Sequence, residues 1–242
     1  MSYDVRADRQ VTIVRLRGLL ALRDVPTVRG VLLTCLTDCP VAVIADVSEL
    51  SVSGPVVLNV FPAVQRQGEP WPNVPLLLAG VTGQLASALA LTAVPEHLTV
   101  CRTLPEALAR AVGPPVRGRL RFALRPTLQA AADARLATRN ACTAWDLDHL
   151  ESAAALVVSE LVDNAAVHAR TDVVVTLIYR ANLLHVCVAD RSSTPARRME
   201  AVRPGRNGNG LRLVEEFASG WGTMPTPEGK LTWATLRTGL SR

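Results

Sequence analysis

The chain has 242 residues, 49% of them hydrophobic, which is enough for one large domain or for two small ones with a core each. Its formal net charge is +5, but Lys230 is the only lysine, the arginines are dispersed and aromatic residues make up 4%. Nucleic-acid binding would favour a clustered basic patch with stacking rings, so no direct nucleic-acid partner is expected.

The cysteines and the N-terminus indicate the compartment. An odd number of cysteines without a CxxC pair argues against a disulfide scaffold and against a zinc site. The first residues, MSYDVRADRQ, lack the apolar stretch of a secretory signal, which predicts a cytoplasmic protein. The uncharged segment 74–94 is interrupted by Pro75, Gly80 and Gly83, so we expect a buried strand and a short helix there and no membrane partner.

Segments typical of strands and helices alternate through the first half of the chain. The run VAVIADV, Val41 to Val47, is typical of a strand buried on both faces. The other expected strands are 11–16, ending at Gly18, then 76–79 and 98–101, and the expected helices are 26–36, 56–67, 83–92 and 104–112. This alternation predicts an α/β domain over residues 1–112, followed by a linker at 113–119 that contains GPPVRG.

The second half, residues 120–242, reads differently. We expect an edge strand at LRFALRP, a helix over 127–145, a second helix from Asp148, two strands joined by a tight turn at Ala181–Asn182, a helix over 211–218 and a last strand KLTWATLRT. Antiparallel strands with grouped helices predict an α+β two-layer sandwich.

The second predicted helix contains SELVDNAAVHA, in which polar residues recur with helical spacing. Glu160, Asn164 and His168 are four residues apart and therefore lie along one helix face. Apolar residues occupy much of the remaining circumference, so this face is predicted to line a pocket. His168 has no partner of a catalytic type nearby and is interpreted as a structural or capping histidine.

Two further elements accompany this helix. Asp190 ends a predicted strand, and GRNGNGLRLVEE is a glycine segment that opens directly into a helix. Each feature alone is more often a turn or a satisfied core group. Their order along the chain favours a nucleotide site instead.

Residues 160–169 resemble the N-box of the GHKL ATPases, in the branch of the anti-sigma factor serine kinases, and the resemblance spans about 120–236. It implies a Bergerat-type ATP-binding fold with ATP and Mg²⁺ as cofactors. It also implies that Asn164 ligates Mg²⁺ and that Glu160 activates the attacking hydroxyl. Asp190 would accept a hydrogen bond from the amino group of adenine. One amide oxygen with phosphate oxygens and waters suits the coordination of Mg²⁺.

The glycine segment is similar to the second glycine box of that family. The resemblance implies that Gly208 and Gly210 bring backbone amides to the phosphates and that the helix beginning at Leu211 adds its positive end. Arg206 and Arg212 are either phosphate ligands or solvated side chains.

The segment 191–205 corresponds to the ATP lid and carries several arginines. The family's first glycine box reads D-x-G, whereas this chain has DRSS, with Ser192 in place of the glycine.

Residues 3–112 are similar to a STAS domain, the fold of anti-sigma factor antagonists. The resemblance is carried by RLRGLL, VIADVSELSV, LLLAG and LPEALARAV. In phosphorylatable members a serine in an S-G context follows an aspartate. Here Ser53-Gly54 is the nearest match, the aspartate is missing and Pro55 follows, so we expect a domain that keeps the fold without the switch.

The combined reading is a cytoplasmic bacterial regulator of the partner-switching type that binds ATP and phosphorylates a serine of an antagonist protein. Its expected partners are a sigma factor or a STAS-type antagonist, with an intramolecular STAS–ATPase contact and a homodimer as open alternatives. A catalytically inactive scaffold with degenerate switch sites is the other reading. A sensor histidine kinase is disfavoured because no histidine lies in a helical hairpin before the ATPase half.

Overall fold

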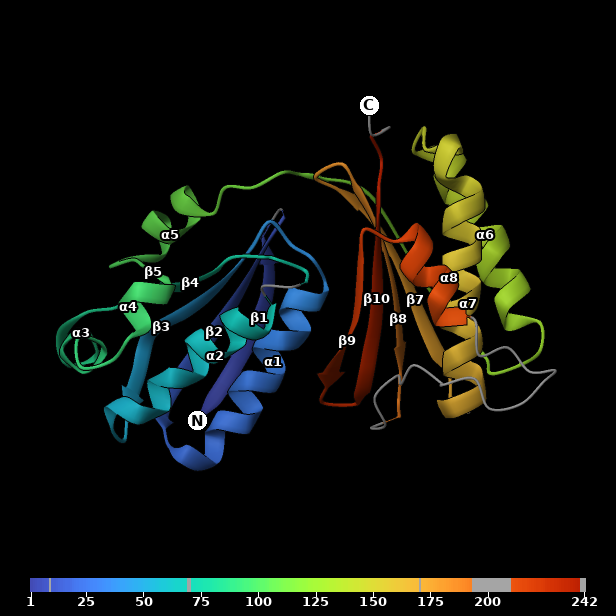
Figure 1. Cartoon of the computed structure of the whole chain (residues 1–242). Coiled ribbons are helices and arrows are strands. Elements are labelled where there is room, and N and C mark those ends of the chain that lie inside the picture. Colours follow the sequence, from blue (N-terminus) through green and yellow to red (C-terminus); the bar gives the residue numbers. More distant parts are fainter. Residues whose placement is uncertain (9, 69–70, 170, 193–209, 240–242) are drawn as a thin grey trace. The chain divides into compact units, whose positions relative to one another are not determined.

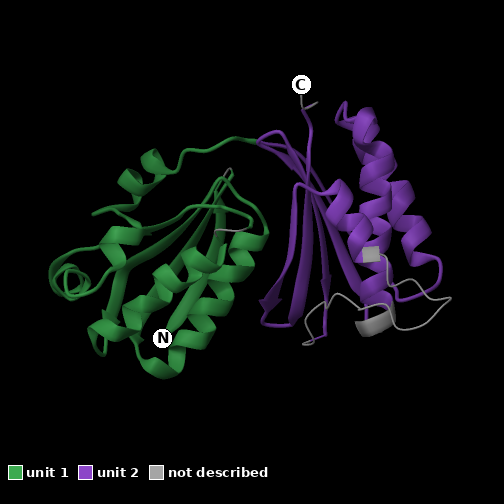
Figure 2. Ribbon diagram, in the orientation of Figure 1, with its two compact units in different colours: residues 1–115 green, residues 116–242 purple. Residues whose placement is uncertain are grey.

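The structure, a computed structural model, describes residues 1–8, 10–68, 71–169, 171–192 and 210–239. The chain divides into two compact units, Met1–Pro115 and Val116–Arg242, called here the first and the second unit (Figure 2). The division falls within the predicted linker. Residues 116–119 of that linker belong to a strand, because the chain becomes extended directly after Pro115.

A five-stranded sheet in the order β1-β2-β3-β4-β5 forms the centre of the first unit. The strands are β1 (Ser2–Asp8), β2 (Val11–Leu20), β3 (Ala42–Val52), β4 (Leu76–Ala79) and β5 (Thr99–Val100). β1 pairs with β2 antiparallel, and the remaining pairs are parallel. The sheet is therefore of the mixed α/β type, as the alternation of segments predicted.

The helices of this unit are η1 (Leu22–Asp24), α1 (Val25–Thr37), η2 (Pro55–Asn59), α2 (Val60–Gly68), α3 (Gly83–Leu89), α4 (Val94–His97) and α5 (Leu104–Arg110). α1 and α2 lie side by side on the sheet (Figure 1). Ala107 of α5 packs in a cluster with Ile44 and Leu77 of the central strands. The first six residues of β3 are buried, because helices cover both faces of this strand.

The sequence missed several features of the first unit, among them the short helix α4 and the extension of β3 to Val52. β1 was not expected, although Tyr3, Val5 and Ala7 alternate with polar residues as they do in a strand. Its residues are nearly all exposed, so neither face of this alternation is buried in a core. β2 continues past Gly18, which takes a φ of +85° within the strand, to Leu20. The helix expected from residue 56 begins as the 3-10 helix η2, and only α2 is α-helical.

The second unit is a two-layer sandwich. Its sheet has the order β6-β7-β8-β10-β9, and every neighbouring pair is antiparallel. The strands are β6 (Val116–Leu124), β7 (Val173–Arg180), β8 (Leu183–Asp190), β9 (Gly220–Thr226) and β10 (Gly229–Arg237). The helices are α6 (Ala130–Ala144), η3 (Asp148–Leu150), α7 (Glu151–Ala169) and α8 (Gly210–Phe217), and Figure 1 shows α6, α7 and α8 on one side of the sheet.

Local sequence explains most of this unit. β6 is an edge strand, as expected, and Ala181 and Asn182 form the tight turn between β7 and β8 with φ values of 52° and 58°. β9 was not predicted. Its sequence, GWGTMPT, contains glycine and proline, and Gly222 provides the space in which the Trp233 indole of β10 packs.

The core of the second unit lies between the sheet and the helices. Alternate residues of β8, Leu184, Val186 and Val188, share one cluster with Leu161 of α7 and Ala234 of β10. Because side chains alternate between the two faces of a strand, the even-numbered residues of β8 and β10 face the helix layer. This face therefore also carries Asp190 and Lys230.

Candidate functional site

α7 places Glu160 and Asn164 one turn apart on a helix that is otherwise part of the core. Val157, Leu161 and Ala165 of the same helix are buried, whereas Glu160 and Asn164 are half-buried. The predicted polar face of α7 is thus present. Both side chains carry oxygen atoms and are partly accessible to solvent. The side chain of His168 lies outside the described residues.

Burial raises the pKa of the Glu160 carboxyl, and the negative charge of Asp163 raises it further. The pKa of Asp163 is also raised by burial, an effect that Arg135 opposes. Arg135 of α6 donates a hydrogen bond to the Ser159 hydroxyl over 3.3 Å. A carboxylate whose pKa is raised accepts a proton more readily at neutral pH, which is what a general base requires.

Asp190, at the end of β8, is engaged by a residue that the sequence analysis did not single out. Its carboxylate forms a buried ion pair with Lys230 of β10, with Nζ 3.2 Å from Oδ1 and 3.1 Å from Oδ2. The backbone N–H of Ser192 donates to Oδ1 over 2.8 Å. The side chains of Lys230 and Asp190 are 6% and 1% exposed, so the two charges neutralise each other inside the unit.

The Asp190–Lys230 pair lies at the end of the sandwich where α7 leads into β7. α7 leads into β7, whose Val174 pairs with Ala189 near the end of β8, and Lys230 at the start of β10 pairs with Asp190. The Arg191 N–H donates to the Thr171 hydroxyl over 3.2 Å, which connects the end of β8 to the segment after α7. The end of β8 that carries Asp190 therefore lies beside the segment that connects α7 to β7.

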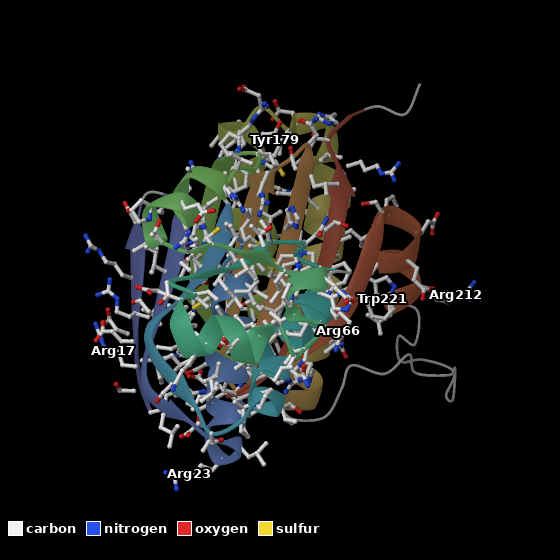
Figure 3. The ribbon with its side chains drawn as sticks, turned by 90° about the vertical axis from the view of Figure 1, so that its left-hand side faces the viewer. Arg17, Arg23, Arg66, Tyr179, Arg212 and Trp221 are labelled. Atoms are coloured by element: carbon white, nitrogen blue, oxygen red, sulfur yellow. The ribbon has the colours of Figure 1, made fainter. Side chains whose placement is uncertain are left out.

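The predicted phosphate segment is described in part. Gly208 and Arg206 lie outside the described residues, as does the lid from residue 193 onwards. Gly210 is the first residue of α8, and Leu211 is half-buried against the core. α8 contacts α7, so its N-terminus belongs to the same layer as Glu160 and Asn164. Arg212 is exposed, and its side chain extends away from the ribbon (Figure 3).

In the first unit, Ser53 is exposed between the end of β3 and η2, and its N–H donates to the Leu20 carbonyl over 3.0 Å. Asp46 of β3 is buried and accepts from Arg15 Nε over 3.0 Å and from the Ser48 N–H over 3.1 Å. Burial would raise the pKa of Asp46, but the hydrogen bonds from Ser48 and Arg15 outweigh it, and the pKa is lowered.

A cavity of about 180 Å³ lies elsewhere in the first unit, along β1 and α5. It is lined by Asp4, Arg6, Asp8, Ile13, Arg15, Leu104 and Leu108. Its walls combine both signs of charge with apolar side chains, and the residues predicted from the sequence are not among them. Within the described ranges, no group of His, Cys, Asp and Glu side chains is arranged to hold a metal, and no helix is long and apolar enough to cross a membrane.

No family model matches this chain, and no curated protein matches it. Solved structures are similar in fold to slightly less than half of it. An anti-sigma factor antagonist from Mycobacterium paratuberculosis is 18% identical over 46% of this chain and 92% of its own, with a TM-score of 0.39. An anti-sigma-factor antagonist (STAS) domain protein from Planctomyces limnophilus is 17% identical over 46% and 97%, with a TM-score of 0.41. A sulfate transporter family protein from Wolinella succinogenes is 24% identical over 44% and 88%, with a TM-score of 0.39.

Proposed function

We propose that this chain is a bacterial partner-switching regulator whose second unit binds ATP with Mg²⁺ and transfers a phosphoryl group to a serine of an antagonist protein. The observation that supports this most is the pair of half-buried polar residues, Glu160 and Asn164, one turn apart on a core helix. A buried helix face carries such groups at a cost in desolvation, which a bound ligand would offset.

Each residue has a part in this proposal. The Asn164 amide oxygen would hold Mg²⁺, which neutralises phosphate charge when bound. The backbone N–H groups at the start of α8, from Gly210, would face the phosphates, where the positive end of the helix stabilises negative charge. Asp190 would accept a hydrogen bond from the amino group of adenine.

Glu160 would act as the general base. The serine oxygen attacks the γ-phosphorus, the bond to the β-phosphate oxygen breaks, ADP leaves and the Glu160 carboxylate accepts the serine proton. The raised pKa of this carboxyl suits the task, since it makes the carboxylate a stronger base.

The test is calorimetric titration of ATP with and without Mg²⁺ into the wild type and Asn164→Ala. We expect Mg²⁺-dependent binding that the substitution reduces by about tenfold or more, the effect typical of losing a metal ligand or its support. Asn140→Ala, on the exposed side of α6, is the matched control and should bind as the wild type does. No binding at millimolar ATP would refute the proposal.

Catalysis is tested separately. Labelled ATP is incubated with the protein and a panel of STAS-type antagonists, and phosphoserine is measured. Glu160→Gln keeps the shape of the side chain and removes the base, so we expect ATP binding to persist while transfer falls by about 10²-fold or more. Equal transfer by Glu160→Gln would remove Glu160 from the mechanism.

A second candidate is a non-catalytic scaffold that docks partner proteins without phosphotransfer. The first glycine box favours it, because Ser192 stands in place of the family's glycine. In the first unit, Ser53 follows Val52 and precedes Gly54 and Pro55, so the aspartate expected before a switch serine is missing. Partner binding that is unchanged by ATP, together with no phosphotransfer, would support this alternative.

A further inference from the structure

We propose that Lys230 is a second base-reading residue, which with Asp190 recognises the edge of a 6-aminopurine at two adjacent points. This inference rests on the proposed nucleotide site and adds a binding residue to it. The juxtaposition that carries it is a buried cation and a buried anion directly opposite each other on β10 and β8, on the face of the sheet toward α7.

The pair has hydrogen-bonding capacity left for a ligand. A lysine ammonium has three N–H donors, and its contacts with the two oxygens of Asp190 engage at most two of them. A carboxylate has about four acceptor sites. Oδ1 accepts hydrogen bonds from the Ser192 N–H and from Lys230 Nζ. Oδ2 contacts Lys230 Nζ. Nζ and Oδ2 therefore present a donor and an acceptor 3.1 Å apart.

A ligand complementary to this pair has a donor beside an acceptor on one edge. In 6-aminopurine, the exocyclic amino group donates and the neighbouring ring nitrogen N1 accepts. The amino group would donate to Asp190 Oδ2, and N1 would accept from Lys230 Nζ. Asp190 by itself could not hydrogen-bond to N1, because a carboxylate oxygen and a ring nitrogen with a lone pair are both acceptors without a proton. Lys230 supplies the missing donor.

Burial makes this recognition selective. The two side chains are 6% and 1% exposed, so a ligand edge that reaches them leaves water as well. A polar atom without a partner is costly in such a place, and hydrogen bonds to charged groups are stronger than neutral ones. Loss of one matched hydrogen bond should therefore lower affinity by about tenfold or more.

The experiment compares ATP with 1-deaza-ATP, in which a C–H group replaces N1, on the wild type, Lys230→Met and Arg237→Met. Arg237 is exposed at the other end of β10, so this variant removes an equal charge without touching the pair. For the wild type and Arg237→Met we expect ATP to bind about tenfold or more tightly than 1-deaza-ATP. In Lys230→Met the two ligands should bind alike.

The outcomes separate the two proposals. If the wild type does not bind ATP, the proposed function fails and this inference fails with it. If ATP binds but Lys230→Met keeps the full preference over 1-deaza-ATP, the nucleotide site stands and Lys230 is only structural. If Lys230→Met does not fold, the comparison of ATP with 1-deaza-ATP on the wild type is used instead. Equal affinity of the wild type for the two ligands overturns the inference. Lys230→Gln, which keeps an N–H donor group on a shorter side chain, should retain part of the preference.

Discussion

Lys230 lies directly opposite Asp190 across β10 and β8, and the ammonium is within 3.2 Å of both carboxylate oxygens inside the second unit. Removal of one partner leaves the other charge buried and unpaired. We therefore expect Lys230→Met or Asp190→Leu to lower the free energy of unfolding by about 3–5 kcal/mol. The double variant should lose much less, because it leaves neither charge buried alone.

Urea denaturation of the four proteins, followed by circular dichroism, measures this coupling. Arg237→Met, on an exposed part of the same strand, is the control and should change stability by less than about 0.5 kcal/mol. Single losses that simply add in the double variant would mean that the pair contributes no coupling energy.

The pKa of Glu160 should respond to Asp163. Burial is the main cause of its raised value and the charge of Asp163 the second, so Asp163→Asn should lower the pKa without restoring the ordinary value. Titration of carboxyl signals by NMR measures the pKa directly. If Glu160 is the base, the acidic limb of the transfer rate moves to lower pH in this variant.

Glu151→Gln, at the opposite end of α7, serves as the control for this titration. Its charge is paired with Arg139, and it should leave the Glu160 signal unchanged. A Glu160 pKa that does not move in Asp163→Asn would contradict the electrostatic account of the site.

His185 should make the second unit acid-sensitive. Burial, and secondarily the charge of Arg180, lower its pKa from 6.5 to about 4. The folded state therefore holds the imidazole neutral while the unfolded state becomes protonated below about pH 6.5. Stability is lost as the pH falls from about 6.5 to about 4, by roughly 3 kcal/mol in total, and this contribution is constant at lower pH.

Denaturation midpoints measured across this pH range test the assignment. His185→Gln has no group that titrates there, so its stability should depend less steeply on pH between about 6.5 and 4. An equal slope in His185→Gln would show that another group causes the acid sensitivity.

Gly118 should tolerate no side chain. A Cβ atom at this position would overlap the Trp145 indole, which packs on the backbone of β6. The ring is rigid, so we expect Gly118→Ala to lower stability by about 1–3 kcal/mol. Gly54→Ala, where a Cβ would meet nothing within 4 Å, is the control and should change stability little. In a Trp145→Ala background the cost of Gly118→Ala should largely disappear, because the clash is gone.

Much of the fold was determined by local sequence. Most of the run from Val41 to Val47 forms the buried first part of β3, and the segment 76–79 became β4. The polar spacing on α7 predicted that Glu160 and Asn164 share a face, and both are half-buried. These features depend on periodicity and on turn residues within one segment, which a sequence shows directly. The ATP and Mg²⁺ roles of Asn164, Glu160, Asp190, Gly208, Gly210 and Leu211 stay predictions.

The elements that local patterns missed depend on pairing between strands. β1 alternates apolar with polar residues but is exposed, and it is held by its pairing with β2 along its whole length. β9 contains residues typical of turns and is held as a strand by its ladder with β10. Sequence patterns within such segments carry little information about partners that lie far along the chain.

The ion pair between Lys230 and Asp190 was visible only in three dimensions. The sequence identified Asp190 at a strand end, but Lys230 was one charged residue at the start of another strand, with a separation of 40 residues between them. Alternation along each strand put both side chains toward the helices, and the register of β8 with β10 set them opposite each other. Register is set by the packing of the whole sheet, so only the tertiary structure could join this cation to this carboxylate.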